Sequence, residues 1–168
     1  MSNINNNGLF QDWKSNNKNP KARFILFLFR LSHLATKNKI VFLVFIPYLI
    51  FYRILVEWLL CCELPYKTIV GSGLRIYHGQ CLVINDGTVI GNNCILRHST
   101  TIGNKQLIDG NYSASPIIGN NVDIGSNVCI IGPIKIGNNV KIGAGSVVVK
   151  DVPSDSIVVG NPARIIGG

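Results

Sequence analysis

The chain has 168 residues, of which 47% are hydrophobic, 14% are charged and 17 are glycine, and its formal net charge is +8. This composition excludes an intrinsically disordered chain, and the glycines favour many tight turns over a helical bundle. The basic excess is uneven, because residues 1–62 hold eight Lys/Arg against two acids, whereas residues 63–168 hold eight against six. The nearly neutral C-terminal part argues against nucleic acid as a partner.

Residues 1–62 form the first of two expected domains, a polar arm followed by an apolar, basic helical region. We expect residues 1–23 to be a loose arm, followed by apolar runs over 24–29 and 40–52. The second run spans 13 residues before Arg53, fewer than the about 20 that cross a bilayer, and Pro47 would kink a helix there. Two interpretations stay open: helices that pack on the body or on neighbouring subunits, or a peripheral membrane contact through residues 24–62. A transmembrane span is the less favoured alternative.

The five cysteines are odd in number and show no CxxC spacing. They are typical of free thiols in a reducing compartment, so we expect a cytoplasmic protein, placed at the inner face of the cytoplasmic membrane if the helical region touches lipid. The missing ligand spacing also argues against a metal site.

Residues 63–168 form the second expected domain, and a six-residue period dominates it. From residue 118 onward every sixth residue is a β-branched aliphatic, and four of the six are followed by glycine: Ile118, Ile124, Ile130, Ile136, Ile142 and Val148. Shorter runs with the same period are Val70, Ile76 and Leu82, then Ile90, Leu96 and Ile102. Neither a helix, with period 3.6, nor a lone strand, with period 2, fits this spacing. It predicts a parallel β-helix whose leading aliphatics stack inward, with residues 104–115 as an exposed loop.

The hexads, together with GAGSVVVKDVP and GNPARII, resemble the hexapeptide-repeat acyltransferases. The resemblance covers residues 63–168 and implies an all-β, left-handed parallel β-helix that works as a homotrimer with active sites between subunits. Within this class, GLRIYHGQCLVIN and VIGNNCILRHSTTIGNK resemble the serine acetyltransferase branch. They are still more similar to the colanic acid and exopolysaccharide O-acetyltransferases, where the similarity extends upstream through FLFRLSHL and IPYLIFYRILVEWL.

The resemblance implies an acyltransferase that moves an acetyl group from acetyl-CoA to a sugar hydroxyl in capsular or exopolysaccharide biosynthesis. The alternative is a serine O-acetyltransferase of cysteine biosynthesis. The family's general base aligns with His78, and its acidic partner aligns with Glu63, fifteen residues earlier. Two departures argue against serine as the acceptor: Ser115 stands where serine acetyltransferases have a second His, and Tyr77 where they have an Asp. We expect direct transfer without an acyl-enzyme, with His78 accepting the hydroxyl proton.

His98 is placed by the repeat. It lies twenty residues after His78, which is one 18-residue coil plus a two-residue slip near Ile84, so we expect it close to His78 as an acceptor or supporting residue together with Tyr77 and Asn85. The residues that the resemblance implies for binding the CoA moiety are Gly103, Asn104, Lys105, Ser126, Ala144, Lys150 and Arg164, the last two as partners of phosphate or as ordinary solvated cations.

Two other functions remain open but less favoured. One is a γ-type carbonic anhydrase, which shares this β-helix and needs three His ligands where residues 63–168 offer two. The other is a catalytically silent structural β-helix.

Overall fold

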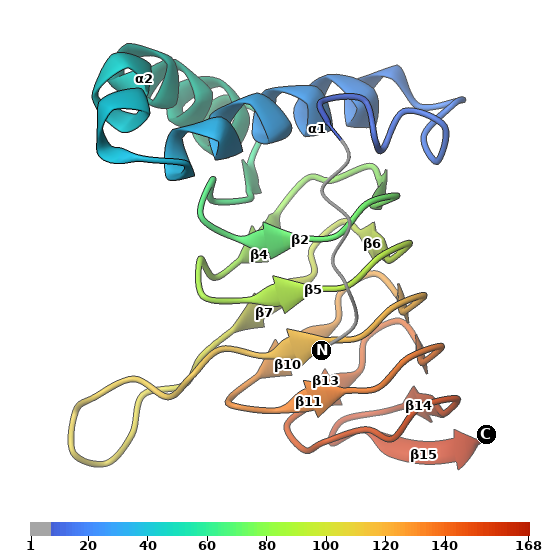
Figure 1. Cartoon of the computed structure of the whole chain (residues 1–168). Helices are drawn as coiled ribbons and strands as arrows, with labels where there is room; N and C mark the ends of the chain where they lie inside the picture. The colour runs from blue at the N-terminus through green and yellow to red at the C-terminus, as the bar shows by residue number, and fades with distance from the viewer. Residues whose placement is uncertain (1–7) are drawn as a thin grey trace.

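A computed structural model describes residues 8–168, in which a helical layer lies across one end of a three-sided coil of short strands (Figure 1). The helical layer consists of α1 (Pro20–His33), the 3-10 helix η1 (Leu34–Thr36), α2 (Lys39–Tyr52) and the π-helical segment η2 (Arg53–Leu59). The strands are β1 (Cys62–Glu63), β2 (Ile69–Val70), β3 (Arg75–Tyr77), β4 (Leu82–Ile84), β5 (Val89–Ile90), β6 (Ile95–Arg97), β7 (Thr101–Gly103), β8 (Ile117–Ile118), β9 (Asp123–Ile124), β10 (Cys129–Ile131), β11 (Lys135–Ile136), β12 (Lys141–Ile142), β13 (Val147–Val148), β14 (Ile157–Val159) and β15 (Arg164–Gly167).

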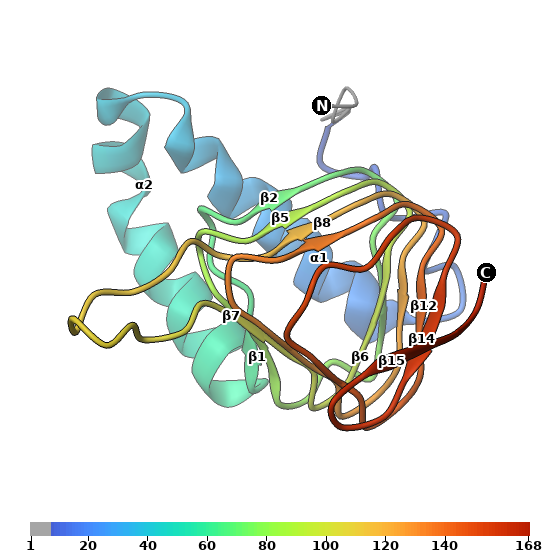
Figure 2. The same ribbon diagram turned by 90° about the horizontal axis from the view of Figure 1, so that it is seen from below.

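Three sheets form the faces of a prism, as the end-on view in Figure 2 shows. Face A is β1-β4-β7-β10-β13, face B is β2-β5-β8-β11, and face C is β3-β6-β9-β12-β14-β15. Neighbouring strands are parallel except β14 and β15, which are antiparallel. The described residues make about five turns of the solenoid. This is the parallel β-helix with an α-helical N-terminal segment that the sequence predicts, in the left-handed form that the resemblance implies.

The aliphatic residues that recur every six positions form the core of the prism. On face A, Ile102 is in register with Ile84 on one side and with Ile130 on the other, and Ile130 is in register with Val148. All four side chains are buried. Burial of one such aliphatic side chain contributes about 1.5–3 kcal/mol, so each coil adds a similar increment to the core. The leading aliphatics predicted from residue 118 onward are all buried, which confirms their inward orientation.

The asparagines of the hexads bind backbone groups at the edge between faces B and C. Asn92 Oδ1 accepts from the Ser72 N–H at 2.9 Å, and Asn120 Oδ1 accepts from the Asn92 N–H at 2.8 Å. Asn138 Oδ1 continues the ladder by accepting from the Asn120 N–H at 2.8 Å. The second Asn of each GNN turn has a positive φ, a conformation that asparagine tolerates: Asn93, Asn121 and Asn139. Each Asn pair therefore turns the corner and satisfies a donor that the corner would leave unpaired.

The polar N-terminal segment is not loose where the structure describes it. Residues 1–7 lie outside the described residues, but residues 8–19 pack against the first coil, and Asp12 and Asn16 are buried. Helix α1 begins at Pro20, four residues earlier than the apolar run suggests, because Asn19 caps it by accepting from the Ala22 N–H at 3.0 Å. The expectation of a loose arm is therefore wrong for residues 8–23.

A buried ion pair joins this segment to the prism. Arg30 Nε and Nη2 donate to the two oxygens of the Asp12 carboxylate, at 2.8 and 3.1 Å. Arg30 also donates to the carbonyls of Val70 and Gly71, and Asp12 accepts from the Leu74 N–H at 2.9 Å. The pair thus satisfies backbone groups at the open end of the first coil, where no preceding coil exists to bind them.

Helix α2 with η2 is longer and more exposed than the sequence suggests. Residues Lys39–Leu59 form one helix of 21 residues, and its most apolar 18-residue stretch has a mean hydropathy of 2.1 and is 11% buried. Pro47 lies inside α2 without ending it, and the helix continues through Arg53, whose Nε donates to Glu57 one turn later at 3.1 Å. By length and composition this helix could cross a membrane, whereas the sequence analysis expects a run too short to do so.

Candidate active site

Two histidine rings meet edge to face at the edge between faces C and A. Tyr77 of β3 is in register with Arg97 of β6, so the residues that follow them, His78 and His98, occupy the same corner in successive coils. Their ring centroids are 5.7 Å apart with an interplanar angle of 76°. His78 has a φ of +69°, and this left-handed corner projects its side chain outward, where it is exposed. The structure confirms that the two rings lie together.

The two imidazoles differ in their surroundings. His98 is half-buried, and its Nδ1 is buried without a hydrogen-bond partner among residues 8–168. His78 is open to solvent, and its carbonyl accepts from the Gln80 amide at 2.7 Å when that amide is oriented to accept from Lys21 as well. His78 is therefore the ring that an outside molecule can reach, with His98 packed behind it.

Glu63 lies on the neighbouring face, in β1, where it is exposed and in register with Val83 of β4. Among residues 8–168, no hydrogen bond or ion pair joins Glu63 to His78. Catalytic hydrogen bonds often form only once substrate is bound, so the pairing of these two residues stays a prediction.

Two of the predicted CoA-binding residues continue the histidine edge. The corner after β9 carries Ser126, and the corner after β12 carries Ala144. The backbone links these corners, because the Asn127 N–H donates to the His98 carbonyl at 3.2 Å and the Gly145 N–H donates to the Ser126 carbonyl at 2.9 Å. One edge of the prism therefore presents two imidazoles followed by two small side chains.

Other predicted residues lie on the opposite edge of face A, between faces A and B. Asn85 follows β4, Asn104 and Lys105 follow Gly103 of β7, and Lys150 follows β13. Neither edge alone gathers the whole predicted site, because the width of face A separates the two groups.

Asn85 makes the contact that links this second edge to the loop. Its Oδ1 accepts from the Ser115 hydroxyl at 2.7 Å and from the Gly87 N–H at 3.0 Å. Ser115 ends the loop that the sequence predicts over residues 104–115, which projects from the prism between β7 and β8 (Figure 1, yellow). In that loop a hydrogen bond from Asn111 holds the pKa of the Asp109 carboxyl below its ordinary value.

Lys150 and Arg164 lie together at the C-terminal end of the prism. Both line a cavity of about 200 Å³, which also includes Asp151 and Pro162. The two cations are 14 residues apart in the sequence. They line the same cavity because β15 runs antiparallel to β14 and leads the chain back toward Lys150. Arg164 itself belongs to β15 on face C, whereas Lys150 follows β13 of face A.

Three residues near the histidines carry no signal in the sequence: Arg75, Arg97 and Asp123. Both Arg75 and Arg97 place their guanidinium groups over the ring of Tyr77, 6.0 and 5.4 Å from its centroid. Arg97 also pairs with Asp123 and donates to the Ile124 carbonyl at 2.8 Å. No sequence motif marks this cluster, because it depends on the register between β3 and β6.

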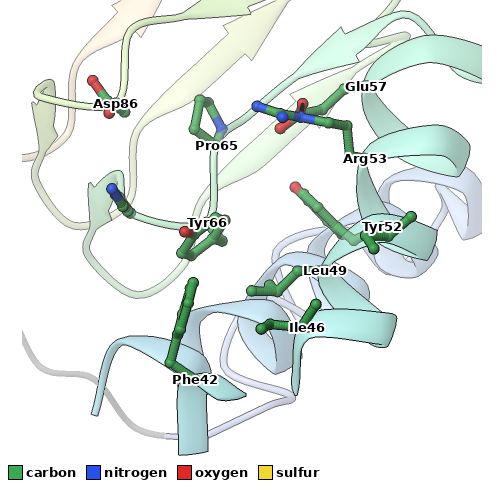
Figure 3. Close-up of a pocket in the computed structure, with 11 residues that line it drawn as sticks. Phe42, Ile46, Leu49, Tyr52, Arg53, Glu57, Pro65, Tyr66 and Asp86 are labelled. Carbon is green, nitrogen blue, oxygen red and sulfur yellow. Dashed lines mark hydrogen bonds and ion pairs between the residues drawn. The ribbon is translucent and has the colours of Figure 1, made fainter. Parts of the chain in front are cut away.

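Away from the histidines, two hollows lie between α2 and the first coil. One of about 280 Å³ is lined by apolar residues of α2 and by Arg53, Tyr66 and Lys67 (Figure 3). The other, of about 760 Å³, shares Phe42, Tyr66 and Lys67 with it. Among residues 8–168 no group of three or more His, Cys, Asp or Glu side chains could hold a metal ion.

Known proteins with similar sequences identify the family to which this chain belongs. Residues 115–150 match the family described as bacterial transferase hexapeptide (six repeats). The protein named as the colanic acid biosynthesis acetyltransferase WcaB of Escherichia coli K12 is 37% identical over 161 residues, which cover 94% of this chain and 98% of that protein. The chain belongs to the hexapeptide-repeat acetyltransferases.

Serine acetyltransferases are also similar to this hexapeptide-repeat acetyltransferase. Serine acetyltransferase 3 of Arabidopsis thaliana is 48% identical over 101 residues, which cover 59% of this chain and 25% of the plant protein. The solved soybean serine acetyltransferase has a TM-score of 0.79 at 27% identity, covering 94% of this chain and 67% of the soybean chain. The Brucella abortus enzyme solved in complex with coenzyme A has a TM-score of 0.78 at 28% identity, covering 95% and 66%.

The co-substrate of this acetyltransferase is acetyl-CoA, and the chain has features that fit it. Ser126 and Ala144 leave the main chain accessible along the histidine edge, and a Cβ at Gly145 would meet nothing within 4 Å. On the second edge a Cβ at Gly103 would approach no atom closer than 3.9 Å. These positions would admit the pantetheine arm of CoA, and the hollow lined by Lys150 and Arg164 would suit the phosphates of CoA.

Proposed function

We propose that this acetyltransferase transfers the acetyl group to a sugar hydroxyl in exopolysaccharide biosynthesis of the colanic acid kind, with His78 as the general base. The observation that carries the proposal is the extent of the similarity to WcaB. That alignment covers 94% of the chain, whereas the alignment to Arabidopsis serine acetyltransferase 3 covers 59%. It must therefore include most of the helical layer as well as the β-helix.

His78 suits the chemistry of acetyl transfer to an alcohol. Acetyl-CoA supplies an activated thioester. The exposed imidazole would accept the hydroxyl proton as the acceptor oxygen bonds to the acetyl carbon, then return that proton to sulfur as the carbon–sulfur bond breaks. A carboxylate on the far ring nitrogen fixes the tautomer and stabilises the imidazolium, which is the role proposed for Glu63. His98, packed against the His78 ring at 5.7 Å, would limit its rotation.

The distribution of predicted residues over two edges favours a site between subunits. The histidine edge and the edge with Asn85, Gly103 and Asn104 lie at opposite sides of face A. In a homotrimer, the histidine edge of one protomer can face the second edge of its neighbour, so a complete site needs two chains. Size-exclusion chromatography with light scattering should give a mass of three chains, and a monomer with full activity would refute this arrangement.

The apolar helix formed by α2 and η2 supports a location at the cytoplasmic membrane face. Its exposed side chains include Leu43, Val44 and Trp58, while Lys37 and Lys39 flank its start. Apolar residues beside cations bind the interface of anionic lipid. We expect the full chain to float with phosphatidylglycerol vesicles and less with phosphatidylcholine.

A matched pair of variants tests this membrane contact. Val44→Glu should abolish flotation, because it places a charge on the exposed face of α2. Val149→Glu, at an exposed position on the β-helix, should leave flotation unchanged. Equal flotation of the two variants would contradict the proposed contact.

The experiment for the acceptor is a turnover assay of the full chain with acetyl-CoA. We expect transfer to oligosaccharide acceptors and a fall of at least about 100-fold in kcat for His78→Ala. His98→Gln is the matched comparison, and it should lose much less because its ring is not the proton acceptor. A greater loss in His98→Gln than in His78→Ala would transfer the role of base to His98.

Serine O-acetylation is the second candidate, because serine acetyltransferases share both sequence and fold with this chain. Against it, Ser115 and Tyr77 replace the His and Asp that the serine enzymes have at these positions. Ser115 here binds Asn85 at 2.7 Å, so its hydroxyl proton is engaged within the protein. Robust turnover of L-serine by the purified chain would reverse the order of the two candidates.

A further inference from the structure

We propose that the acceptor is an acidic saccharide whose oxyanion, a carboxylate or a phosphate, binds at Lys18 and Arg75 beside His78. This inference rests on the proposed function, because it names the acceptor of the same site. It starts from a cavity of about 450 Å³ between residues 15–19 of the N-terminal segment and residues 75–78. His78 lies in the wall of this cavity, so a molecule bound there is next to the proposed base.

The ionised side chains that line the cavity are both cations, Lys18 and Arg75. Neither forms an ion pair within residues 8–168. By contrast, the neighbouring Arg97 is neutralised by Asp123, and the buried Arg30 is neutralised by Asp12. The cavity therefore holds two positive charges that the described chain leaves uncompensated.

Arg75 is fixed in place, which distinguishes it from a mobile surface cation. Its Nε donates to the Ser15 carbonyl at 2.7 Å, and its Nη1 contacts the Tyr77 hydroxyl at 3.4 Å. The segment that holds it is itself tied to β3, because Asn16 binds the Leu74 carbonyl and the Ile76 N–H. A guanidinium held in this way loses little further conformational freedom when it binds an oxyanion.

Tyr77 provides a surface for the sugar ring. Its side chain is exposed, and its ring contributes to the cavity wall between Arg75 and His78. The Arg75 and Arg97 guanidinium groups lie over this ring, 6.0 and 5.4 Å from its centroid, so the part left to a sugar is the exposed remainder of the ring and its polar hydroxyl. Small-molecule sites combine such partly apolar contacts with a few fixed polar groups that set orientation. With the acidic group at Arg75 and the ring on Tyr77, a neighbouring hydroxyl would be directed toward the imidazole of His78.

Binding titrations of the full chain test the inference without requiring turnover. The probes are methyl β-glucuronide, glucose 1-phosphate and the neutral methyl β-glucoside, compared at low and at 0.5 M salt. A charged hydrogen bond is worth about 10- to 100-fold in affinity, so at least one anionic probe should bind more tightly than the glucoside by that factor. The tighter of the two anions distinguishes a uronate acceptor from a phosphorylated one.

Substitutions test whether Lys18 and Arg75 cause the tighter binding of the anionic probes. Arg75→Gln and the exposed Lys18→Gln should each weaken binding of the anion and leave the weak binding of the glucoside unchanged. Lys141→Gln is the matched control, because Lys141 is exposed on the same face C and in the same register as Arg75, three strands away. Equal affinity for anionic and neutral probes, or a preference that survives both substitutions, would overturn the inference.

Failure of the proposed function gives a different result. If no sugar is acetylated but the charge-dependent binding is present, the acidic site stands and the acetyl acceptor has been misassigned. If anionic and neutral sugars are acetylated with the same kcat/KM and bind equally, the O-acetyltransferase stands and the acidic site falls.

Discussion

The ion pair between Asp12 and Arg30 should be the most sensitive polar contact for stability. The side chains of Asp12 and Arg30 are 4% and 5% exposed, and they are joined by two hydrogen bonds. Asp12→Ala leaves the guanidinium buried without its carboxylate and leaves the Leu74 N–H unpaired. Breaking a buried pair in this way costs about 3–5 kcal/mol. At about 2–4 °C per kcal/mol for a chain of this size, the melting temperature should fall by about 6–20 °C.

Thermal melting followed by circular dichroism measures this loss. The matched control is Glu57→Ala, which breaks the pair between Arg53, whose side chain is 67% exposed, and Glu57, whose side chain is 10% exposed. The cation that loses its partner stays in water here, so the lost pair is worth about 0–1 kcal/mol and the control should shift the melting temperature by at most about 4 °C. The double variant Asp12→Ala/Arg30→Leu should recover part of the loss, because it removes the unpaired buried charge. Equal melting temperatures for Asp12→Ala and Glu57→Ala would refute the assignment of the buried pair.

Two further predictions concern the adjacent thiols and the close approach of coils. Burial raises the pKa of Cys62 from its ordinary value of 9.0 to about 12, whereas Cys61 is exposed, so a thiol reagent at pH 8 should label Cys61 quickly and Cys62 only on unfolding. The pKa of Cys62 is higher in the folded state than in the unfolded state. The stability that this thiol contributes is therefore complete below pH 9 and is lost as the pH rises toward 12. Cys62→Val should abolish this pH dependence of stability. Gly91→Ala should destabilise the fold by about 1–3 kcal/mol, because its Cβ would lie 2.4 Å from the Gly119 carbonyl oxygen; Gly103→Ala, with no atom closer than 3.9 Å, is the control for the same melting measurement.

The β-helix could be predicted from the sequence because its period is local and repeated. Each hexad contains its own inward aliphatic and its own corner residues, so Ile130 needs no knowledge of distant segments to be placed in the core. The contact of the His78 ring with the His98 ring followed from the same counting, since residues about one coil apart occupy equivalent corners. Periodicity therefore fixed both the fold and the relative position of the two imidazoles.

The features that the sequence did not reveal depend on single, non-periodic contacts. The N-terminal segment is ordered by the bond of Asp12 to Arg30, 18 residues apart, and by contacts of both with the first coil. The helix continues past Arg53, and the guanidinium donates to Glu57 one turn later. Arg75 meets Ser15 only because the N-terminal segment packs along β3, 60 residues away in the sequence. Hydropathy patterns carry no signal for such contacts.

The constant spacing of the coils fixes the distances between equivalent corners along the prism. Equivalent corners on the histidine edge recur at every turn, and neighbouring strands are about 4.8 Å apart, so a length along this edge can change only in whole steps. Three such steps, about 14 Å, separate the level of His78 from that of Ala144. Inserting or deleting one complete 18-residue turn between them would keep every core contact in register and yet alter the reach by one step. Such length variants should remain folded, so any loss of acetyl-CoA binding in them would report the changed distance along the edge and not unfolding of the β-helix.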